Sequence, residues 1–258
     1  MKITALTENI SLDPNIAAEH GLSLYIETKN HKILFDMGQT ALFAENAERL
    51  GIDLSQVDLA VLSHGHYDHG GGIAHFLEIN KTAPIYLSRY AFGDYYNGTQ
   101  KYIGLDKTLQ SSKRLIFVGD ELKIDDSLSL WSCNMRERKY DLGSFGLNMK
   151  ADGEFLPDSF VHEQYLLIEE DGKRVLISGC SHKGVMDIVS WFEPDVLVGG
   201  FHYSKLALDS ALKEYSQRLS SHKTAYYTCH CTGAEQFEFM QKFMPQLSYL
   251  YCGTEIEI

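Results

Sequence analysis

The sequence predicts a layered α/β (α+β) fold in which mixed β-sheets are covered by helices. Short apolar or alternating runs, typical of strands, recur along the whole chain of 258 residues. Several of these runs alternate with stretches of helical period, which disfavours an all-β sandwich. Others follow one another directly, as at "EEDGKR" (169–174), where an Asp-Gly pair marks a tight hairpin turn. Direct hairpins disfavour a purely parallel sheet, so a layered fold with mixed sheets fits best.

The expected elements follow from these two periodicities. Strands are expected at residues 2–8, 22–28, 32–38, 58–63, 83–88, 115–120, 127–132, 164–170, 174–180, 195–202, 224–230 and 247–253. Helices are expected at residues 40–51, 184–192, 207–219 and 233–243. Residues 88–115 contain many Tyr and Gly with weak periodicity, which indicates an irregular insertion over one face. Because the chain has no internal repeat and no low-complexity tract, we expect a single domain over residues 1–258.

The composition disfavours several classes of partner. A formal net charge of −12 disfavours nucleic acid, because phosphate binding requires a field of Lys and Arg. The first residues contain no signal-peptide core, and no apolar stretch approaches the roughly 18 residues that span a bilayer. Five cysteines, an odd number, indicate free or metal-associated thiols in place of a disulfide framework. We therefore expect a cytoplasmic protein that acts on a small molecule, with no indication of its oligomeric state.

The most informative stretch is "SHGHYDHG" (63–70), which directly follows the apolar run "VDLAVL" (57–62). His64 and His66 alternate by two, and Asp68 and His69 follow within one helical turn, so two directions of approach are available. Neutral imidazole is the commonest metal-binding group, and a carboxylate offsets the charge of a dication. Loops at the carboxyl ends of strands are common places for functional groups. The pattern therefore predicts a metal site, with two neighbouring ions as one arrangement.

"SHGHYDHGGG" resembles the His-x-His-x-Asp-His signature of the metallo-β-lactamase superfamily, and "ILFDMG" (33–38) is similar to the strand that precedes this signature. The stretches "ISGCSHKGVMDI" (177–188), "VGGFHY" (198–203) and "CHCTG" (229–233) most resemble a branch of dihydropterin synthases of the methanopterin pathway and related hydrolases. The resemblance implies a four-layer αββα sandwich of two mixed sheets. It also implies a dinuclear metal site on loops at one edge.

The resemblance implies specific metal ligands. His64 and His66 match ligands of the first metal, and Asp68 and His69 match those of the second. His230 matches the last histidine of the family pattern and is expected to bind the second metal. Asp36 matches an aspartate that orients the signature loop through hydrogen bonds without binding metal. Alternation along the strand is expected to turn Cys229 and Cys231 away from the His230 side, as packing residues.

The sequence departs from the family pattern at the remaining ligand of the first metal. Cys180 stands where the family has a bridging aspartate, and His162 lies 18 residues upstream. The branch instead has a recurring "GCSH" histidine, which is His182 here; we prefer His182 and keep His162 as the alternative. Cys180 is expected to contact substrate, with a thiolate ligand or a packing residue as alternatives. His202, at another strand end, is expected to contact substrate or assist proton transfer.

The expected function is metal-dependent hydrolysis of a small phosphate, ester, lactone or amide. Two divalent ions, zinc first and manganese or iron as alternatives, would activate water, with Asp68 as the catalytic residue that orients the water and accepts its proton. The alternatives are a dihydropterin-forming synthase acting on a phosphoribosyl substrate, a di-iron redox protein and a non-catalytic binding protein. The remaining histidines, at positions 20, 31, 75 and 222, are expected to have no role in the site. Arg89, Lys183 and Lys205 are possible anion contacts, but we expect them to be solvated surface residues.

Overall fold

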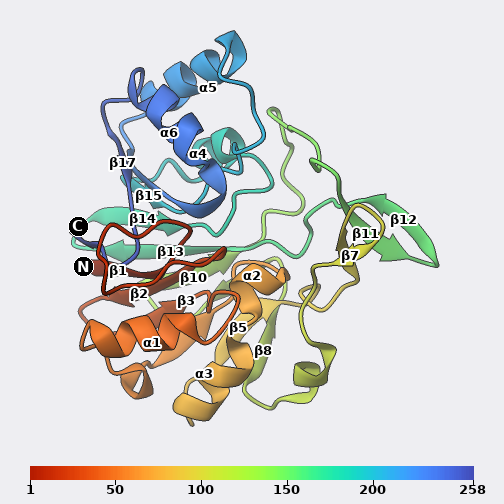
Figure 1. Ribbon diagram of the computed structural model, residues 1–258, viewed down its shortest axis with the longest axis vertical. Helices are drawn as coiled ribbons and strands as arrows, with labels where there is room; N and C mark the ends of the chain where they lie inside the picture. Colours follow the sequence, from red (N-terminus) through yellow and green to blue (C-terminus); the bar gives the residue numbers. More distant parts are fainter.

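A computed structural model describes residues 1–258 as two seven-stranded sheets packed face to face, with helices on both outer sides and a small third sheet beside them (Figure 1). The strand order of the first sheet is β18-β1-β2-β3-β4-β5-β8, and that of the second is β17-β16-β15-β14-β13-β10-β9. Each sheet contains parallel and antiparallel pairs. The expectation of an αββα sandwich with two mixed sheets is confirmed.

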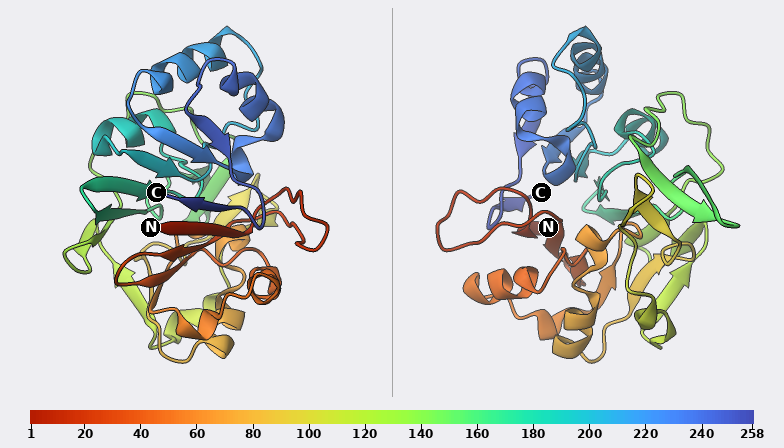
Figure 2. Two further views of the ribbon diagram at one scale, coloured as in Figure 1. Left: turned by 90° about the vertical axis from the view of Figure 1, so that its left-hand side faces the viewer. Right: turned by 45° about the vertical axis from the view of Figure 1, so that its right-hand side comes forward.

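The first sheet is built mainly from the first half of the chain. Its strands are β1 (Lys2–Thr7), β2 (Ser23–Glu27), β3 (Lys32–Phe35), β4 (Leu59–Val61), β5 (Ile85–Ser88), β8 (Leu115–Val118) and β18 (Glu255–Glu257). Helices α1 (Leu42–Arg49) and α3 (Ile73–Ile79), in orange at the bottom of Figure 2, cover its outer face. The short α2 (Tyr67–Gly70) follows β4. The chain ends come together because β18 pairs with β1.

The second sheet is built from the second half. Its strands are β9 (Glu121–Lys123), β10 (Leu128–Trp131), β13 (Tyr165–Glu170), β14 (Lys173–Ile177), β15 (Val196–Val198), β16 (Ala225–Thr228) and β17 (Leu247–Tyr249). Its outer face is covered by α4 (Val185–Phe192), α5 (Ser210–Ser220) and α6 (Ala234–Gln241). The three-residue turn η3 (His230–Thr232) follows β16, and η1 (Leu54–Gln56) and η2 (Lys107–Ser111) are similar short turns. No helix has both the length and the apolar character needed to cross a bilayer.

Burial on both faces explains why so many strands are apolar throughout. In β3, Ile33 and Phe35 point into the core between the two sheets, while Leu34 packs under the helices. In β14, Ile177 faces the same central core, and Leu176 packs against the helices of the other side. Each sheet therefore separates one central core from one outer core, which requires apolar side chains at successive positions.

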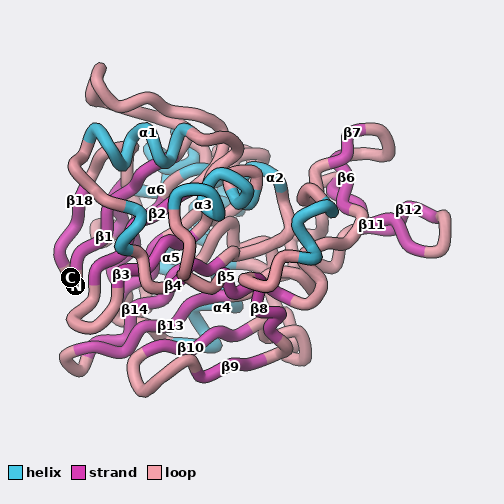
Figure 3. Tube along the Cα trace, turned by 90° about the horizontal axis from the view of Figure 1, so that it is seen from below, coloured by secondary structure: helices cyan, strands magenta, loops and turns pink.

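The third sheet joins two segments that are distant in sequence. Its strands are β6 (Tyr95–Asn97), β7 (Lys101–Tyr102), β11 (Leu147–Ala151) and β12 (Glu154–Pro157), in the order β12-β11-β6-β7. Residues 88–115, expected to be irregular, thus contain two short strands, and β6 pairs with β11. The four strands extend away from the sandwich (Figure 3).

Polar turns gather at one edge of the sandwich because the strands that precede them run in parallel. β14, β15 and β16 are parallel neighbours in the second sheet, and β3 and β4 are parallel neighbours in the first. The carboxyl ends of parallel strands lie at the same edge of a sheet. This topology brings the segments after residues 35, 61, 177, 198 and 228 to one region.

Candidate metal centre

The buried carboxylate of Asp36 fixes the loop that begins after β4. Its Oδ1 accepts a hydrogen bond from the Ser63 backbone N–H (2.7 Å), and its Oδ2 accepts from the Ser63 hydroxyl (2.7 Å). Oδ2 also accepts from His69 Nδ1 (2.6 Å). Asp36 reaches these groups with a left-handed backbone, φ +59°, at the end of β3. One carboxylate therefore holds both ends of the histidine-rich loop, as the resemblance implies.

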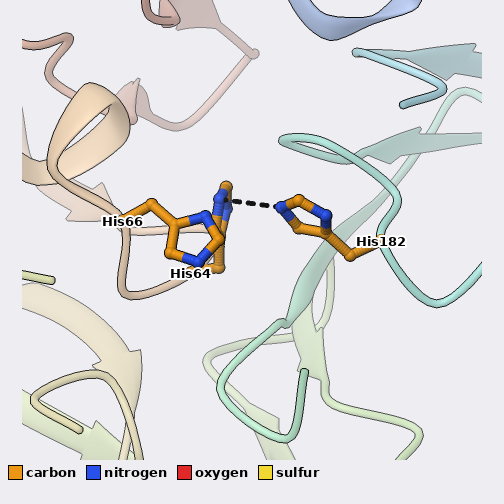
Figure 4. A group of neighbouring side chains, drawn as sticks. All are labelled: His64, His66 and His182. Carbon is orange, nitrogen blue, oxygen red and sulfur yellow. Dashed lines mark hydrogen bonds between the residues drawn. The ribbon is translucent and has the colours of Figure 1, made fainter. Parts of the chain in front are cut away.

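Three buried imidazoles form the first cluster. One ring nitrogen each from His64, His66 and His182 lies within 4.8 Å of the others, and His64 Nε2 is 3.3 Å from His182 Nε2 (Figure 4). The Ser63 hydroxyl gives its one proton to Asp36, so it accepts from His64 Nδ1 at 2.8 Å. This network assigns the proton of His64 to Nδ1 and leaves the Nε2 lone pair facing His182.

The first cluster contains buried ring nitrogens that no group of the protein satisfies. Burial and the neighbouring imidazoles hold the pKa of His64 and of His182 well below the usual value, so both rings are neutral at pH 7. His66 Nε2 and His182 Nδ1 are buried without any hydrogen-bond partner. An unsatisfied buried polar atom costs about 1–3 kcal/mol. Neutral imidazoles with free lone pairs are the donor set that a divalent metal ion takes.

The second cluster joins the signature loop to η3. His69 Nε2 lies 3.2 Å from His230 Nε2, and one oxygen of Asp68, Oδ2, lies 3.9 Å and 3.5 Å from these two atoms. The Nδ1 atoms point away from the cluster: that of His69 donates to Asp36, and that of His230 donates to Asn9 Oδ1 at 2.8 Å. Both Nε2 atoms therefore point to one place beside a carboxylate, which fits a cation.

The charges of the second cluster favour a dication. Burial acts to raise the pKa of Asp68, but the imidazoles of His69 and His20 hold it well below the usual value, so this group is a carboxylate at neutral pH. Burial acts to lower the pKa of His69, but the carboxylates of Asp36 and Asp68 raise it to about 9. These carboxylates would equally stabilise a cation at Nε2 in place of the proton.

The two clusters meet at Cys180 and at the end of one cavity. Cys180 Sγ lies 3.2 Å from His69 Nε2 and shares a group of close ligand atoms with His64 and His69. The ring of His202 lies 4.3 Å from the ring of His182. The cavity encloses about 300 Å³. Its inner end is lined by residues of the candidate metal centre, namely His66, Asp68, Cys180, His182, His202 and His230. Its mouth is lined by Tyr67, Asn97, Lys101, Leu147 and Lys205, among others.

The small third sheet shapes the mouth of the cavity. Asn97 of β6, Lys101 of β7 and Leu147 of β11 all line it. Lys205, after β15, lines it too, whereas Lys183 is neither solvated nor in the cavity. The Lys183 ammonium is buried and donates to backbone carbonyls of the neighbouring turns. The sequence expectation for Lys183 is therefore corrected.

His162 differs from the histidines of the two clusters because both of its ring nitrogens are occupied. Its Nδ1 accepts from the Gly65 backbone N–H at 2.9 Å, and its Nε2 lies 3.0 Å from Asp158 Oδ2. The ring is fully buried and lies 5.1 Å from that of His66. His162 therefore supports the signature loop from behind, and no lone pair is left free on its ring.

Two buried glutamates hold the histidines that come from distant segments. Glu163 Oε1 accepts from the His182 backbone N–H at 2.6 Å, and Glu8 Oε2 accepts from the His230 backbone N–H at 3.0 Å. His230 has a left-handed backbone, φ +49°, so its turn benefits from this anchor. No local pattern in the sequence points to either glutamate, because each accepts from a backbone N–H that is distant along the chain.

Two expectations about neighbouring residues are wrong. His20 was expected to be ordinary, but its Nε2 lies 3.2 Å from Asp68 Oδ2 and it lines the cavity. Cys231 was expected to face away from the His230 side, but it also lines the cavity. β16 ends at Thr228, and the turn that follows breaks the two-residue alternation on which that expectation rested. Cys229, by contrast, packs in the central core as expected.

Gly179, just after β14, is required by the close approach of this turn to the signature loop. A Cβ at this position would overlap the Ser63 side chain and lie 3.2 Å from Asp36 Oδ2. We expect Gly179→Ala to lower the free energy of unfolding by about 2–3 kcal/mol, because the loop must shift. Gly153→Ala is the control: its φ is +86° but nothing lies within 4 Å, so strain alone should cost about 1 kcal/mol. Denaturant unfolding checks both, and equal losses would contradict the close-approach argument.

Comparison with known proteins identifies the class. The sequence model of the metallo-beta-lactamase superfamily matches residues 17–218. The chain is 30% identical to an uncharacterized protein of Methanocaldococcus jannaschii, over 91% of either chain. It therefore belongs to the metallo-beta-lactamase superfamily, and its His/Asp/Cys clusters are groups that could hold metal ions.

Particular relatives and solved structures refine this placement. A second protein of Methanocaldococcus jannaschii, named 7,8-dihydropterin-6-methyl-4-(beta-D-ribofuranosyl)-aminobenzene-5'-phosphate synthase, is 27% identical over 93% of this chain and 90% of its own. The solved structure of Tm1679, described as a metal-dependent hydrolase of the beta-lactamase superfamily, is 27% identical with a TM-score of 0.85, covering 100% of this chain and 99% of its own. Zinc-bound PqqB from Methylobacterium extorquens shares the fold at 9% identity, with a TM-score of 0.63 over the full length of both chains.

Proposed function

We propose that this protein is a metal-dependent hydrolase with a dinuclear centre, acting on a small substrate that contains a phosphate, ester, lactone or amide group. The observation that carries the proposal is the pairing of Nε2 atoms between the signature loop and two turns that are distant in sequence. His64 faces His182 at 3.3 Å, and His69 faces His230 at 3.2 Å. Such short N···N approaches between buried rings suit atoms that share a cation, because at most one proton fits between each pair.

The ligand assignment follows the two clusters. His64, His66 and His182 would hold the first ion, and the second would be held by Asp68, His69 and His230. Zinc fits the imidazole-rich set best, and manganese or iron are the alternatives. Two adjacent divalent ions lower the pKa of water and polarise a carbonyl or phosphoryl oxygen.

The side chains around the ions have separate roles. Asp68, an ionised carboxylate at the cavity wall, would orient the attacking water and accept its proton. Cys180 and His202 line the same cavity and would contact the substrate. Asp36 and Asn9 would keep His69 and His230 in the tautomer that leaves Nε2 free.

The choice between His182 and His162 can be tested directly. His182→Ala is expected to remove one of two bound ions, because the first cluster loses one of its three imidazole ligands. His162→Ala should keep both ions bound but lower stability, since it removes the hydrogen bonds to Gly65 and Asp158. Elemental analysis of the two variants gives the answer. Loss of an ion in His162→Ala together with full occupancy in His182→Ala would reverse the assignment.

A second candidate reaction comes from the synthase-named relative, which covers nearly the whole chain. The chain would then act on a phosphoribosyl substrate, and Lys101 and Lys205 at the cavity mouth would bind its phosphate. Turnover assays with phosphodiester, lactone and phosphoribosyl substrates, on protein loaded with its native metal, distinguish the two. Hydrolysis of the first two classes supports a hydrolase; exclusive conversion of phosphoribosyl substrates to a pterin product would overturn it in favour of the synthase.

We also propose that the protein works in the cytoplasm on a small molecule, without nucleic-acid or membrane partners. All five cysteines are free and buried, which suits a reducing compartment. The cavity of about 300 Å³ suits a small substrate and is too small to hold a nucleic-acid duplex. The net charge of −12 opposes binding to polyanions.

A further inference from the structure

We propose that Cys180, His202 and Cys231 form a third cation site beside the dinuclear centre, specific for one soft divalent ion such as Zn²⁺ or Cd²⁺. The two sulfur atoms and one ring nitrogen of His202 all lie within 4.8 Å of one another. Two thiolates and an imidazole are a strong donor set for these ions. The dinuclear centre requires neither Cys231 nor His202 as a ligand.

The topology explains why the three residues converge. Cys180 follows β14, His202 follows β15, and Cys231 lies in η3 after β16. These strands are adjacent and parallel, so their carboxyl ends deliver one residue each to the same point. The site is thus a product of three successive strand ends of one sheet.

The surrounding backbone holds the sulfur of Cys231 in place. The His202 backbone N–H donates to Cys231 Sγ at 3.3 Å, and Cys231 Sγ donates to the Cys180 carbonyl at 3.5 Å. A Cβ at Gly200 would overlap this sulfur, so glycine leaves the space that the thiol fills. These two contacts fix the position of the Cys231 sulfur on the side of Cys180 and His202.

The cavity gives an ion access to this site, and one ligand atom of the site has no hydrogen-bond partner. All three residues line the cavity, which provides an entry path. His202 Nδ1 is buried and has no hydrogen-bond partner. Binding of one dication by the two thiols releases two protons to solvent and leaves a fourth position for water. While an ion is held here, Cys180 and His202 bind the ion in place of substrate, and the cavity that would admit substrate is narrower.

Cadmium-113 NMR tests the proposal on the full chain, stripped of metal by a chelator and titrated with ¹¹³Cd²⁺. Sulfur ligands shift the ¹¹³Cd resonance strongly downfield, and two sulfurs shift it further than one or none. We expect a two-sulfur resonance in addition to those of the nitrogen- and oxygen-rich sites. Cys231→Ser should abolish it and leave the others. Cys133→Ser, which alters a buried free cysteine outside the cavity, should preserve every resonance.

His202→Ala provides a second variant in case Cys231→Ser does not fold. It should weaken Cd²⁺ binding at the two-sulfur site by at least about ten-fold without moving the other resonances. His64→Ala should do the reverse, removing a nitrogen-rich resonance and keeping the two-sulfur one, so failure of the dinuclear centre is distinguishable. A two-sulfur resonance unchanged in Cys231→Ser or in His202→Ala, or its absence from the saturated wild-type chain, would overturn the proposal.

Discussion

Asp68→Asn is expected to lower turnover by about 10²–10⁴-fold while leaving the fold intact. The amide has nearly the shape of the carboxylate, but it cannot accept a proton and carries no charge. Asp68 Oδ2 faces His20 at 3.2 Å and His230 at 3.5 Å, so the substitution removes the negative charge that these rings surround. The measurement is kcat on the substrate found by screening, together with metal content and thermal unfolding.

Asp125→Asn is the matched control for this experiment. Asp125 also pairs with a histidine, His31, at 2.5 Å, but it lies outside the cavity. Its substitution should leave turnover within about two-fold of wild type, because its carboxylate contacts neither the cavity nor any proposed metal ligand. If Asp68→Asn behaved like Asp125→Asn, the proposed role of Asp68 in catalysis would have to be abandoned.

Asp36→Asn is expected to weaken metal binding at the second cluster by about 10–100-fold, because it removes the acceptor that fixes the His69 ring. It should also lower the free energy of unfolding by about 3 kcal/mol, since a buried charged partner of Ser63 and His69 is lost. Asn tolerates the left-handed backbone of Asp36, φ +59°, nearly as well as Asp does. The variant therefore tests the hydrogen bonds and not the backbone.

Metal titration and denaturant unfolding of the Asp36→Asn variant check these two effects separately. A drop in stability with unchanged metal affinity would show that Asp36 supports the loop without orienting His69. Unchanged values of both would contradict the role derived from its three hydrogen bonds.

The sandwich was predictable because its periodicities are local. Strands such as β3 and β14 are apolar at successive positions, and the four predicted helices correspond to α1, α4, α5 and α6. Helix α3 was missed because it directly follows the signature loop and spans only Ile73–Ile79. The third sheet was missed because its strands have two to five residues, and β6 pairs with β11 some fifty positions away.

The candidate site was visible in the sequence where one loop carries several of its residues, and less so where distant turns converge. His64, His66, Asp68 and His69 stand together in sequence, so their chemistry is visible there. His20 reaches Asp68 across 48 positions, a contact that no local pattern encodes.

A left-handed residue accounts for the error at Cys231. His230 has φ +49°, and this turn places Cys231 in the cavity, where simple alternation would have faced it away. Such conformations are uncommon outside glycine, and period-based reasoning does not anticipate them.

Elemental analysis of the chain purified without added metal tests the central claim most directly, when wild type is compared with His64→Ala and His230→Ala. The two rings belong to different clusters, so each variant removes one ligand from one of the two proposed sites. We predict about two divalent ions per wild-type chain, and about one fewer in either variant. A wild-type chain that carries no metal, or variants that carry as much as wild type, would contradict the account.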